Sequence, residues 1–153
     1  MSIPRTTLYT HVQPDGTNIH INVDSLLAAI KAAQLEVVLV PVEMRVVRAF
    51  IDGNAISARR MMQLTPEQLF QPIIYGYDGT RDKAGRGNVL MIDGHHRYAR
   101  AASDGLPLIR SYVVERYFWE AHRLELPAMT QEELRNLPPH AVSYYAGQKR
   151  TQP

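Results

Sequence analysis

Hydrophobic and polar residues alternate at the start of the chain in the pattern of a β-hairpin. Two alternating segments, at 7–12 and 18–23, flank a Pro-Asp-Gly turn and predict a pair of antiparallel strands. Apolar residues at helical spacing follow, so we expect a helix that is capped by Asp24 or Ser25 and ends at Gln34. The buried stripe of this helix is predicted to contain Leu26, Leu27 and Ile30.

The middle of the chain alternates between short apolar runs and helical patterns. The run Val37–Val42 is continuously apolar and rich in β-branched residues, which predicts a buried strand. Pro41 indicates that this strand ends there or lies at a sheet edge. A polar loop that contains glycines is expected at 78–88. The other predicted elements are strands at Pro72–Tyr77, Val89–Ile92 and Leu108–Val114, and helices at Ala55–Leu64, from Thr65, at His95–Ser103 and from Thr130.

These elements predict an α+β fold in which a small mixed sheet is flanked by helices. We expect a core at 37–116, preceded by a hairpin-and-helix extension at 1–36 and followed by a helical extension and tail at 117–153. All three parts are expected to form one globular unit, because no internal repeat or low-complexity segment separates them.

Composition narrows the class of protein without identifying it. The 153 residues are 45% hydrophobic and 21% charged, which provides enough apolar material for a core. Cysteine is absent, so disulfides and cysteine chemistry are excluded. The chain lacks both the apolar leader of a secreted protein and an apolar run that could span a bilayer, so we expect a cytoplasmic protein without membrane insertion. A formal charge of +2 is compatible with a nucleic-acid partner but does not establish one.

One segment carries the residues best suited to chemistry, at the point where a predicted strand turns into a predicted helix. Its five residues are Asp93, Gly94, His95, His96 and Arg97. Gly94 permits a tight turn and a close approach of a ligand to the backbone, and the first amides of the following helix favour an anion. Arg97 can grip phosphate oxygens, Asp93 can help to hold a divalent metal, and either histidine can move a proton near neutral pH. The segment therefore predicts a phosphate- or nucleotide-binding site.

Structural explanations of the same residues remain open. Asp93 and Gly94 can form an ordinary turn and helix cap, with the histidines and Arg97 as polar residues of a solvated helix. A zinc site is a further alternative, although adjacent histidines at a helix start point in different directions, whereas zinc motifs place them one turn apart. Seven basic residues are interpreted either as solvated charges or as contacts to phosphate or DNA: Arg45, Arg48, Arg59, Arg60, Arg81, Lys83 and Arg86.

The segment Val89–Ala102 resembles the signature of the ParB/sulfiredoxin superfamily, in which a strand enters a Gly-x-His-Arg turn followed by an alanine-rich helix. The order of the surrounding elements is similar over Val37–Val114. The resemblance is to small plasmid- or phage-borne members with an Asp-Gly-His-His-Arg motif, the fertility-inhibition type of protein. It implies a compact α+β domain whose motif turn binds nucleotide phosphates.

Carried over by position, the resemblance implies that Gly94, His96 and Arg97 form the phosphate cradle. His95 stands where sulfiredoxin has a cysteine, so sulfinic acid reductase activity is excluded. The serine-kinase branch of the family uses a glutamate base near its first strand. Glu43 is the counterpart of that base, or an ordinary exposed glutamate at a strand end.

The resemblance also implies a dependence on nucleotide and an association with DNA. The first hypothesis is an enzyme that binds ATP or CTP with Mg²⁺, hydrolyses it, and binds or cuts DNA in plasmid or phage maintenance or in the inhibition of conjugative DNA transfer. Gly94 and Arg97 would stabilise phosphate charge, Asp93 or Glu43 would assist the metal or water, and a histidine would move protons. A protein of the DNA-transfer machinery would be a further partner. The second hypothesis is a nucleotide-switched module that binds DNA or protein without catalysis, and the third is a kinase of a free amino acid.

Overall fold

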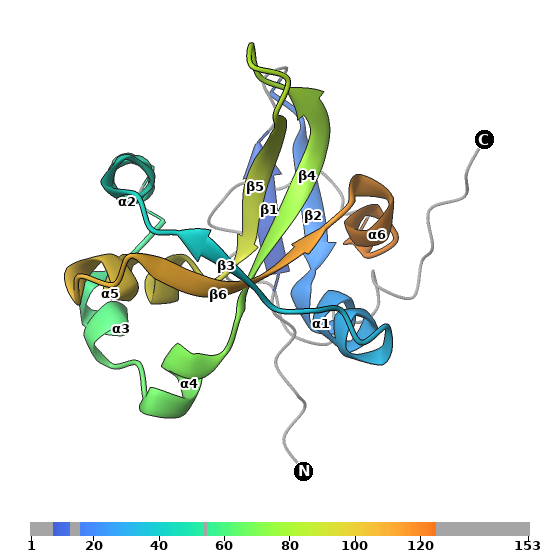
Figure 1. The fold of residues 1–153 in the computed structure, drawn as a ribbon. Helices are drawn as coiled ribbons and strands as arrows, with labels where there is room; N and C mark the ends of the chain where they lie inside the picture. The colour runs from blue at the N-terminus through green and yellow to red at the C-terminus, as the bar shows by residue number, and fades with distance from the viewer. Residues whose placement is uncertain (1–7, 13–15, 54, 125–153) are drawn as a thin grey trace. The chain divides into compact units, whose positions relative to one another are not determined.

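Figure 1 shows the fold of the chain in a computed structural model. The structure describes residues 8–12, 16–53 and 55–124. Contacts divide the chain into two compact units, the first formed by Met1–Ala33 with Tyr117–Pro153 and the second by Gln34–Arg116. The residues of the predicted site all belong to the second unit.

The first unit is built on a three-stranded antiparallel sheet in the order β1-β2-β7. The predicted hairpin is confirmed as β1 (Leu8–Val12) and β2 (Asn18–Asn22), and β7 (Arg123–Leu124) pairs with β2. The predicted helix from Thr130 lies outside the described residues. Helix α6 (Arg116–Glu120) precedes β7 and buries Trp119.

Helix α1 (Val23–Ala32) follows β2 directly and buries Leu26 and Ile30, as predicted. The prediction of its cap was wrong. Asn22 is the N-cap, and its side chain accepts a hydrogen bond from the Ser25 amide at 3.1 Å. The last residue of a strand already has the extended backbone that an N-cap requires, so the helix begins without a linker.

The second unit contains a four-stranded sheet in the order β3-β6-β4-β5. β4 and β6 run parallel, whereas the β3–β6 and β4–β5 pairs are antiparallel. The predicted α+β class, with a mixed sheet and flanking helices, is therefore confirmed. The four strands are β3 (Val38–Pro41), β4 (Ile73–Arg81), β5 (Gly87–Asp93) and β6 (Leu108–Val114).

Strand β3 lies at an edge of this sheet, so the prediction of a buried strand was wrong. The side chains of Val38 and Leu39 are exposed, with Leu39 at 62%. A run of apolar residues indicates a strand, but its position in the sheet depends on the order of strands that are distant in sequence. The inference from Pro41, that the strand ends there or lies at an edge, is confirmed.

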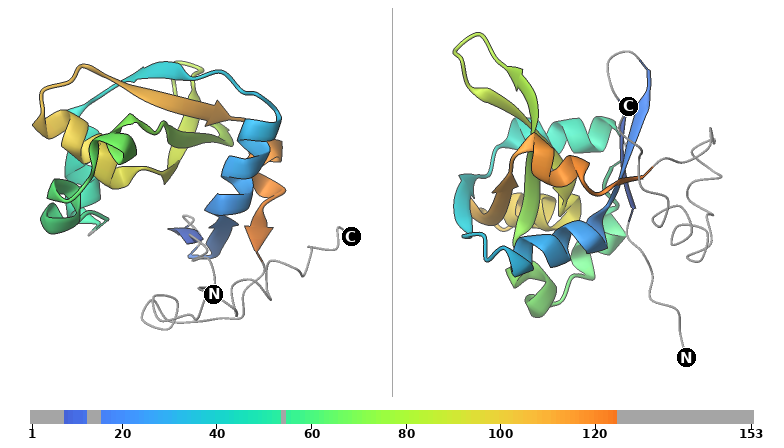
Figure 2. Two further views of the ribbon diagram at one scale, coloured as in Figure 1. Left: turned by 90° about the horizontal axis from the view of Figure 1, so that it is seen from below. Right: turned by 90° about the vertical axis from the view of Figure 1, so that its right-hand side faces the viewer.

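The hairpin of β4 and β5 is longer than predicted. β4 continues to Arg81 and β5 begins at Gly87, so only residues 82–86 of the predicted loop connect the two strands. The Asp82 carboxylate closes this turn by accepting hydrogen bonds from the amides of Ala84 and Arg86, both at 2.9 Å. The hairpin projects beyond the helices of the same unit (Figures 1 and 2).

Helices of the second unit pack in two tiers on the sheet. α5 (His95–Ser103), which was predicted with the same bounds, packs on β4 and β6. α2 (Met44–Asp52), which was not predicted, and α3 (Ala58–Met62) pack on α5. α4 (Pro66–Phe70) begins where a helix was predicted from Thr65, and Thr65 is its N-cap. The shared core contains Val47, Ile73, Tyr75, Met91, Tyr98, Ala99, Ala101 and Ile109.

No helix in the described part of the chain combines the length and apolar character needed to cross a membrane.

Candidate functional site

The strand-to-helix turn of the motif is formed as predicted, and Gly94 is its pivot. β5 ends at Asp93, Gly94 has a left-handed φ of 105°, and α5 begins at His95. A Cβ atom at Gly94 would lie 2.3 Å from Cγ2 of Ile73, which is fully buried in β4. Both the backbone angle and the close approach of Ile73 therefore require glycine here.

Asp93 and Arg97 hold each other across this turn. The Arg97 guanidinium lies 2.8 Å from the Asp93 carboxylate, and their side chains are 10% and 30% exposed. The same guanidinium donates to the carbonyls of Gln71 and Pro72, at 3.0 and 3.2 Å. Arg97 thus links the start of α5 to the segment that precedes β4. In this arrangement its guanidinium is hydrogen-bonded to protein groups, the Asp93 carboxylate and the two carbonyls.

His95 turns into the unit, toward α2. Its ring meets that of Phe50 edge to face, with a centroid separation of 4.7 Å. Burial, and secondarily the nearby His96, lowers the pKa of His95 to about 4. The imidazole of His95 is therefore neutral at pH 7.

The buried His95 makes stability depend on pH. Its pKa is about 6.5 in an unfolded chain and about 4 in the fold, so the unfolded chain binds the extra proton first. Stability should fall as pH decreases from 6.5 to 4, with a slope that approaches about 1.4 kcal/mol per pH unit from this one group. Urea denaturation across that range measures the slope, and His95→Gln should flatten it. An equal slope in both proteins would contradict this assignment.

His96 turns the other way, toward α3. Its Nε2 atom accepts a hydrogen bond from the Ser57 amide at 3.0 Å, so the proton of the neutral ring lies on Nδ1. Burial, followed by the positive charge of Arg60, lowers the pKa of His96. Ser57 is also the N-cap of α3 and accepts from the Arg60 amide at 3.4 Å. The starts of α3 and α5 therefore meet at His96.

Sequence reasoning did not select Ser57, although it carries a recognisable signal. A serine directly before a helical segment is a preferred N-cap. Its partnership with His96 joins positions 39 residues apart and has no local signal. The upstream arginines were considered as phosphate contacts, and the structure brings the charge of Arg60 close to the motif.

Glu43 lies at the N-cap of α2. Its carboxylate pairs with Arg45 at 2.8 Å, and its amide donates to the Tyr98 hydroxyl at 2.7 Å. Tyr98 is the residue that follows Arg97, so Glu43 is linked to α5 through its backbone. Glu43 also lines a cavity of about 520 Å³.

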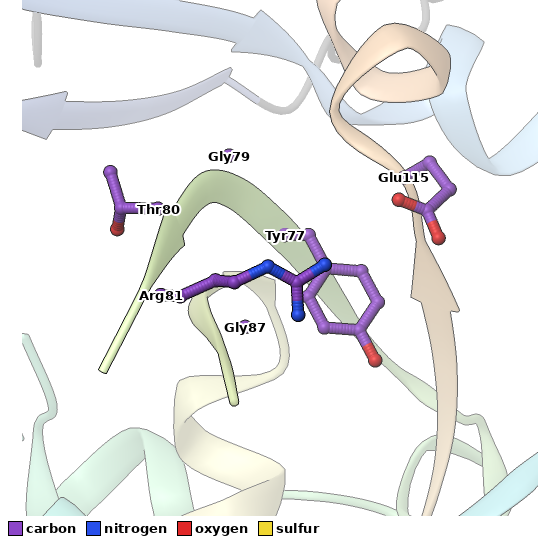
Figure 3. A pocket seen from close by; sticks show the side chains of 6 residues that line it. All are labelled: Tyr77, Gly79, Thr80, Arg81, Gly87 and Glu115. Carbon is purple, nitrogen blue, oxygen red and sulfur yellow. The ribbon is translucent and has the colours of Figure 1, made fainter. Parts of the chain in front are cut away.

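Two further cavities lie in the second unit. One, of about 540 Å³, is a mainly apolar space between α2, α3 and α5. The other, of about 300 Å³, lies beside the β4–β5 hairpin, and Figure 3 shows Tyr77, Arg81 and Glu115 around it. Arg81 and Glu115 give this smaller cavity one charge of each sign, so it carries no net preference for an anion.

The predicted metal role of Asp93 stays a prediction. Within the described ranges, no group of three or more His, Asp or Glu side chains is arranged to hold a metal ion. One oxygen of the Asp93 carboxylate is bonded to Arg97, which leaves the other as the atom that could contact Mg²⁺.

Comparison with protein-family models, with curated proteins and with solved structures finds no match to this chain. What the site can do is therefore judged from its own geometry.

Proposed function

We propose that this chain binds a nucleotide through its phosphate groups where α3 and α5 begin, as a protein of the ParB/sulfiredoxin type. One observation carries the proposal. The N-terminus of α5 has no side-chain cap. His96, in the first turn of this helix, is close enough to Arg60 for the arginine's positive charge to lower the His96 pKa.

The physical basis is an excess of hydrogen-bond donors and positive charge. The first turn of a helix has amides without intrahelical partners, and the helix dipole adds a partial positive charge. Gly94 caps α5 without a side chain, so no side-chain cap hydrogen bond is made at this end of the helix. Arg60, whose charge acts on the neighbouring His96, contributes a full positive charge. A phosphate group satisfies such donors better than any neutral ligand.

In this proposal Arg97 positions the site rather than gripping the nucleotide. Its bonds to Asp93 and to two carbonyls hold the turn in the shape that presents the α5 amides. The cradle proposed for phosphate therefore consists of the Gly94 turn, His96 and Arg60. ATP or CTP, with Mg²⁺, is the proposed ligand.

Hydrolysis and the DNA-directed role belong to the same proposal. For hydrolysis, a histidine of the motif would move the proton of an attacking water. The projecting hairpin carries exposed basic residues at 81–86, a suitable surface for the phosphate backbone of DNA (Figure 2). We propose plasmid or phage DNA maintenance, or inhibition of conjugative DNA transfer, as the setting in the cytoplasm.

A nucleotide-switched binding module is the second candidate, and one observation favours it. Asp93 and Arg97 are bonded to each other, and His95 is packed on Phe50. With these groups engaged, nucleotide would bind without rapid turnover. Release of inorganic phosphate from ATP and CTP distinguishes the two, because a switch binds nucleotide without sustained release.

The test is calorimetric binding of ATP, CTP, GTP and ADP with Mg²⁺ to the full chain. Arg60→Gln should weaken binding about tenfold, the effect of losing one partly exposed charge-assisted contact. Arg59→Gln is the matched control, since it removes the same charge from the same helix at a residue that does not act on the His96 pKa. Absence of binding by the wild type, or equal loss in both variants, would overturn the proposal.

A further inference from the structure

We propose that the cavity between α2 and the sheet is a second ligand site, which takes an aromatic organic anion such as an aryl carboxylate or sulfonate. This site is independent of the nucleotide proposal. Its volume of about 520 Å³ suits a small organic molecule. Its lining includes Glu43, Arg45, Tyr75, Tyr77, Arg86 and Tyr98.

Aromatic rings and aliphatic groups form most of the lining, and the polar tips of two rings are already satisfied. The Tyr98 hydroxyl donates to the Pro41 carbonyl and accepts from the Glu43 amide. The Tyr75 hydroxyl is hydrogen-bonded to Tyr98, and burial raises the Tyr75 pKa, so this phenol stays neutral. With their hydroxyls engaged, these rings contribute aromatic surface rather than free hydrogen-bonding groups to the lining. Planar aromatic rings pack well against such a surface.

The charges that line the cavity favour an anion. Arg45 comes from α2 and Arg86 from the hairpin turn, where it pairs with Asp82 at 3.2 Å, so two separate elements contribute an arginine to the lining. Glu43 is the single carboxylate of the lining, and it is paired with Arg45. Both arginine side chains are about four-fifths exposed, at 79% and 81%, and their ion pairs are of the weak surface kind that a ligand can displace. A guanidinium binds the planar oxygens of a carboxylate or sulfonate through paired hydrogen bonds.

Gly87 shapes the end of the cavity that lies nearest the hairpin. A Cβ atom there would lie 2.9 Å from Cδ1 of Tyr77, so the absence of a side chain lets that ring lie against the strand. Tyr77 and Gly87 both line the cavity.

The test uses two fluorescent probes with the full chain: 1-anilinonaphthalene-8-sulfonate, which is an aromatic anion, and N-phenyl-1-naphthylamine, its neutral counterpart. Val89→Trp places a large ring in the cavity at a position that is 48% exposed, so the fold should tolerate it. We expect this variant to weaken binding of the sulfonate at least about tenfold. Ser103→Trp is the matched control, because it fills the apolar space between α2, α3 and α5 instead, and it should leave binding unchanged.

The charge requirement is tested with Arg45→Gln combined with Arg86→Gln. The double variant should weaken binding of the sulfonate about tenfold and leave binding of the neutral probe unchanged. Absence of sulfonate binding by the wild type would overturn the proposal. So would loss of binding in Ser103→Trp but not in Val89→Trp, or an equal effect of the arginine variants on both probes.

Discussion

Gly94→Ala is expected to destabilise the second unit by about 3–4 kcal/mol, as the sum of a backbone cost and a steric cost. A φ of 105° costs an alanine about 1–2 kcal/mol that glycine does not incur. The new methyl carbon would also lie 2.3 Å from Cγ2 and 2.7 Å from Cβ of Ile73, which is fully buried and has no room to withdraw. Urea denaturation followed by far-ultraviolet circular dichroism measures the loss.

Gly85→Ala separates the two costs. Gly85 also has a left-handed φ, of 81°, but a Cβ atom there would meet no other atom within 4 Å. We expect this variant to lose only the backbone contribution, about 1 kcal/mol. If both variants lost the same free energy, the contact with Ile73 would not be what demands glycine in the motif.

Arg97→Ala is expected to destabilise the unit by about 3 kcal/mol, because it leaves a half-buried carboxylate and two carbonyls without their donor. The Arg97 side chain is only 10% exposed and bridges α5 to the residues that enter β4. Replacing Asp93 as well should add little further loss, since the pair acts as one interaction. Thermal and urea denaturation of the single and double variants give the coupling free energy.

Arg100→Ala is the control on the same helix. Arg100 pairs with Asp104 at the same four-residue spacing, at 3.1 Å, but the two side chains are 22% and 46% exposed. Its guanidinium also donates to the carbonyl of Met61 at 3.3 Å, so its loss should be about 1 kcal/mol, with one carbonyl and an exposed carboxylate left without a partner. Should Arg97→Ala prove as mild as Arg100→Ala, Arg97 would not be a clamp, and its charge would be available to phosphate after all.

The strand–turn–helix of the motif could be predicted because each of its signals is local. An apolar strand, a glycine and an alanine-rich segment follow one another without interruption, and the bounds of α5 are those predicted. The capping box at Thr65 is local in the same way. Helix α2 carried a local signal as well, in the apolar spacing of Val46, Val47 and Phe50, but it follows a strand so closely that no separate start was apparent.

What could not be predicted depends on partners that are distant in sequence. Arg97 was expected to face phosphate, yet it bonds to carbonyls 25 and 26 residues earlier in the chain. His96 meets the amide of Ser57, and His95 meets Phe50. Adjacent histidines diverge because successive residues of a helix point about 100° apart. The two histidines of the motif therefore contact different elements, α2 for His95 and the start of α3 for His96.

Pro41 limits the ability of the edge strand β3 to pair with a strand of another molecule. The amide of Val42 bonds inward to Pro107 on the β6 side, so the alternation of an extended chain turns the nitrogen of Pro41 outward. Proline has no hydrogen to offer there, and within β3 Leu39 is then the single outward-facing amide donor. A foreign strand that approached this apolar edge would find too few donors to build a ladder. Pro41 therefore protects this edge against aggregation through strand pairing. The exposed apolar side chains of Val38 and Leu39 would otherwise favour such aggregation.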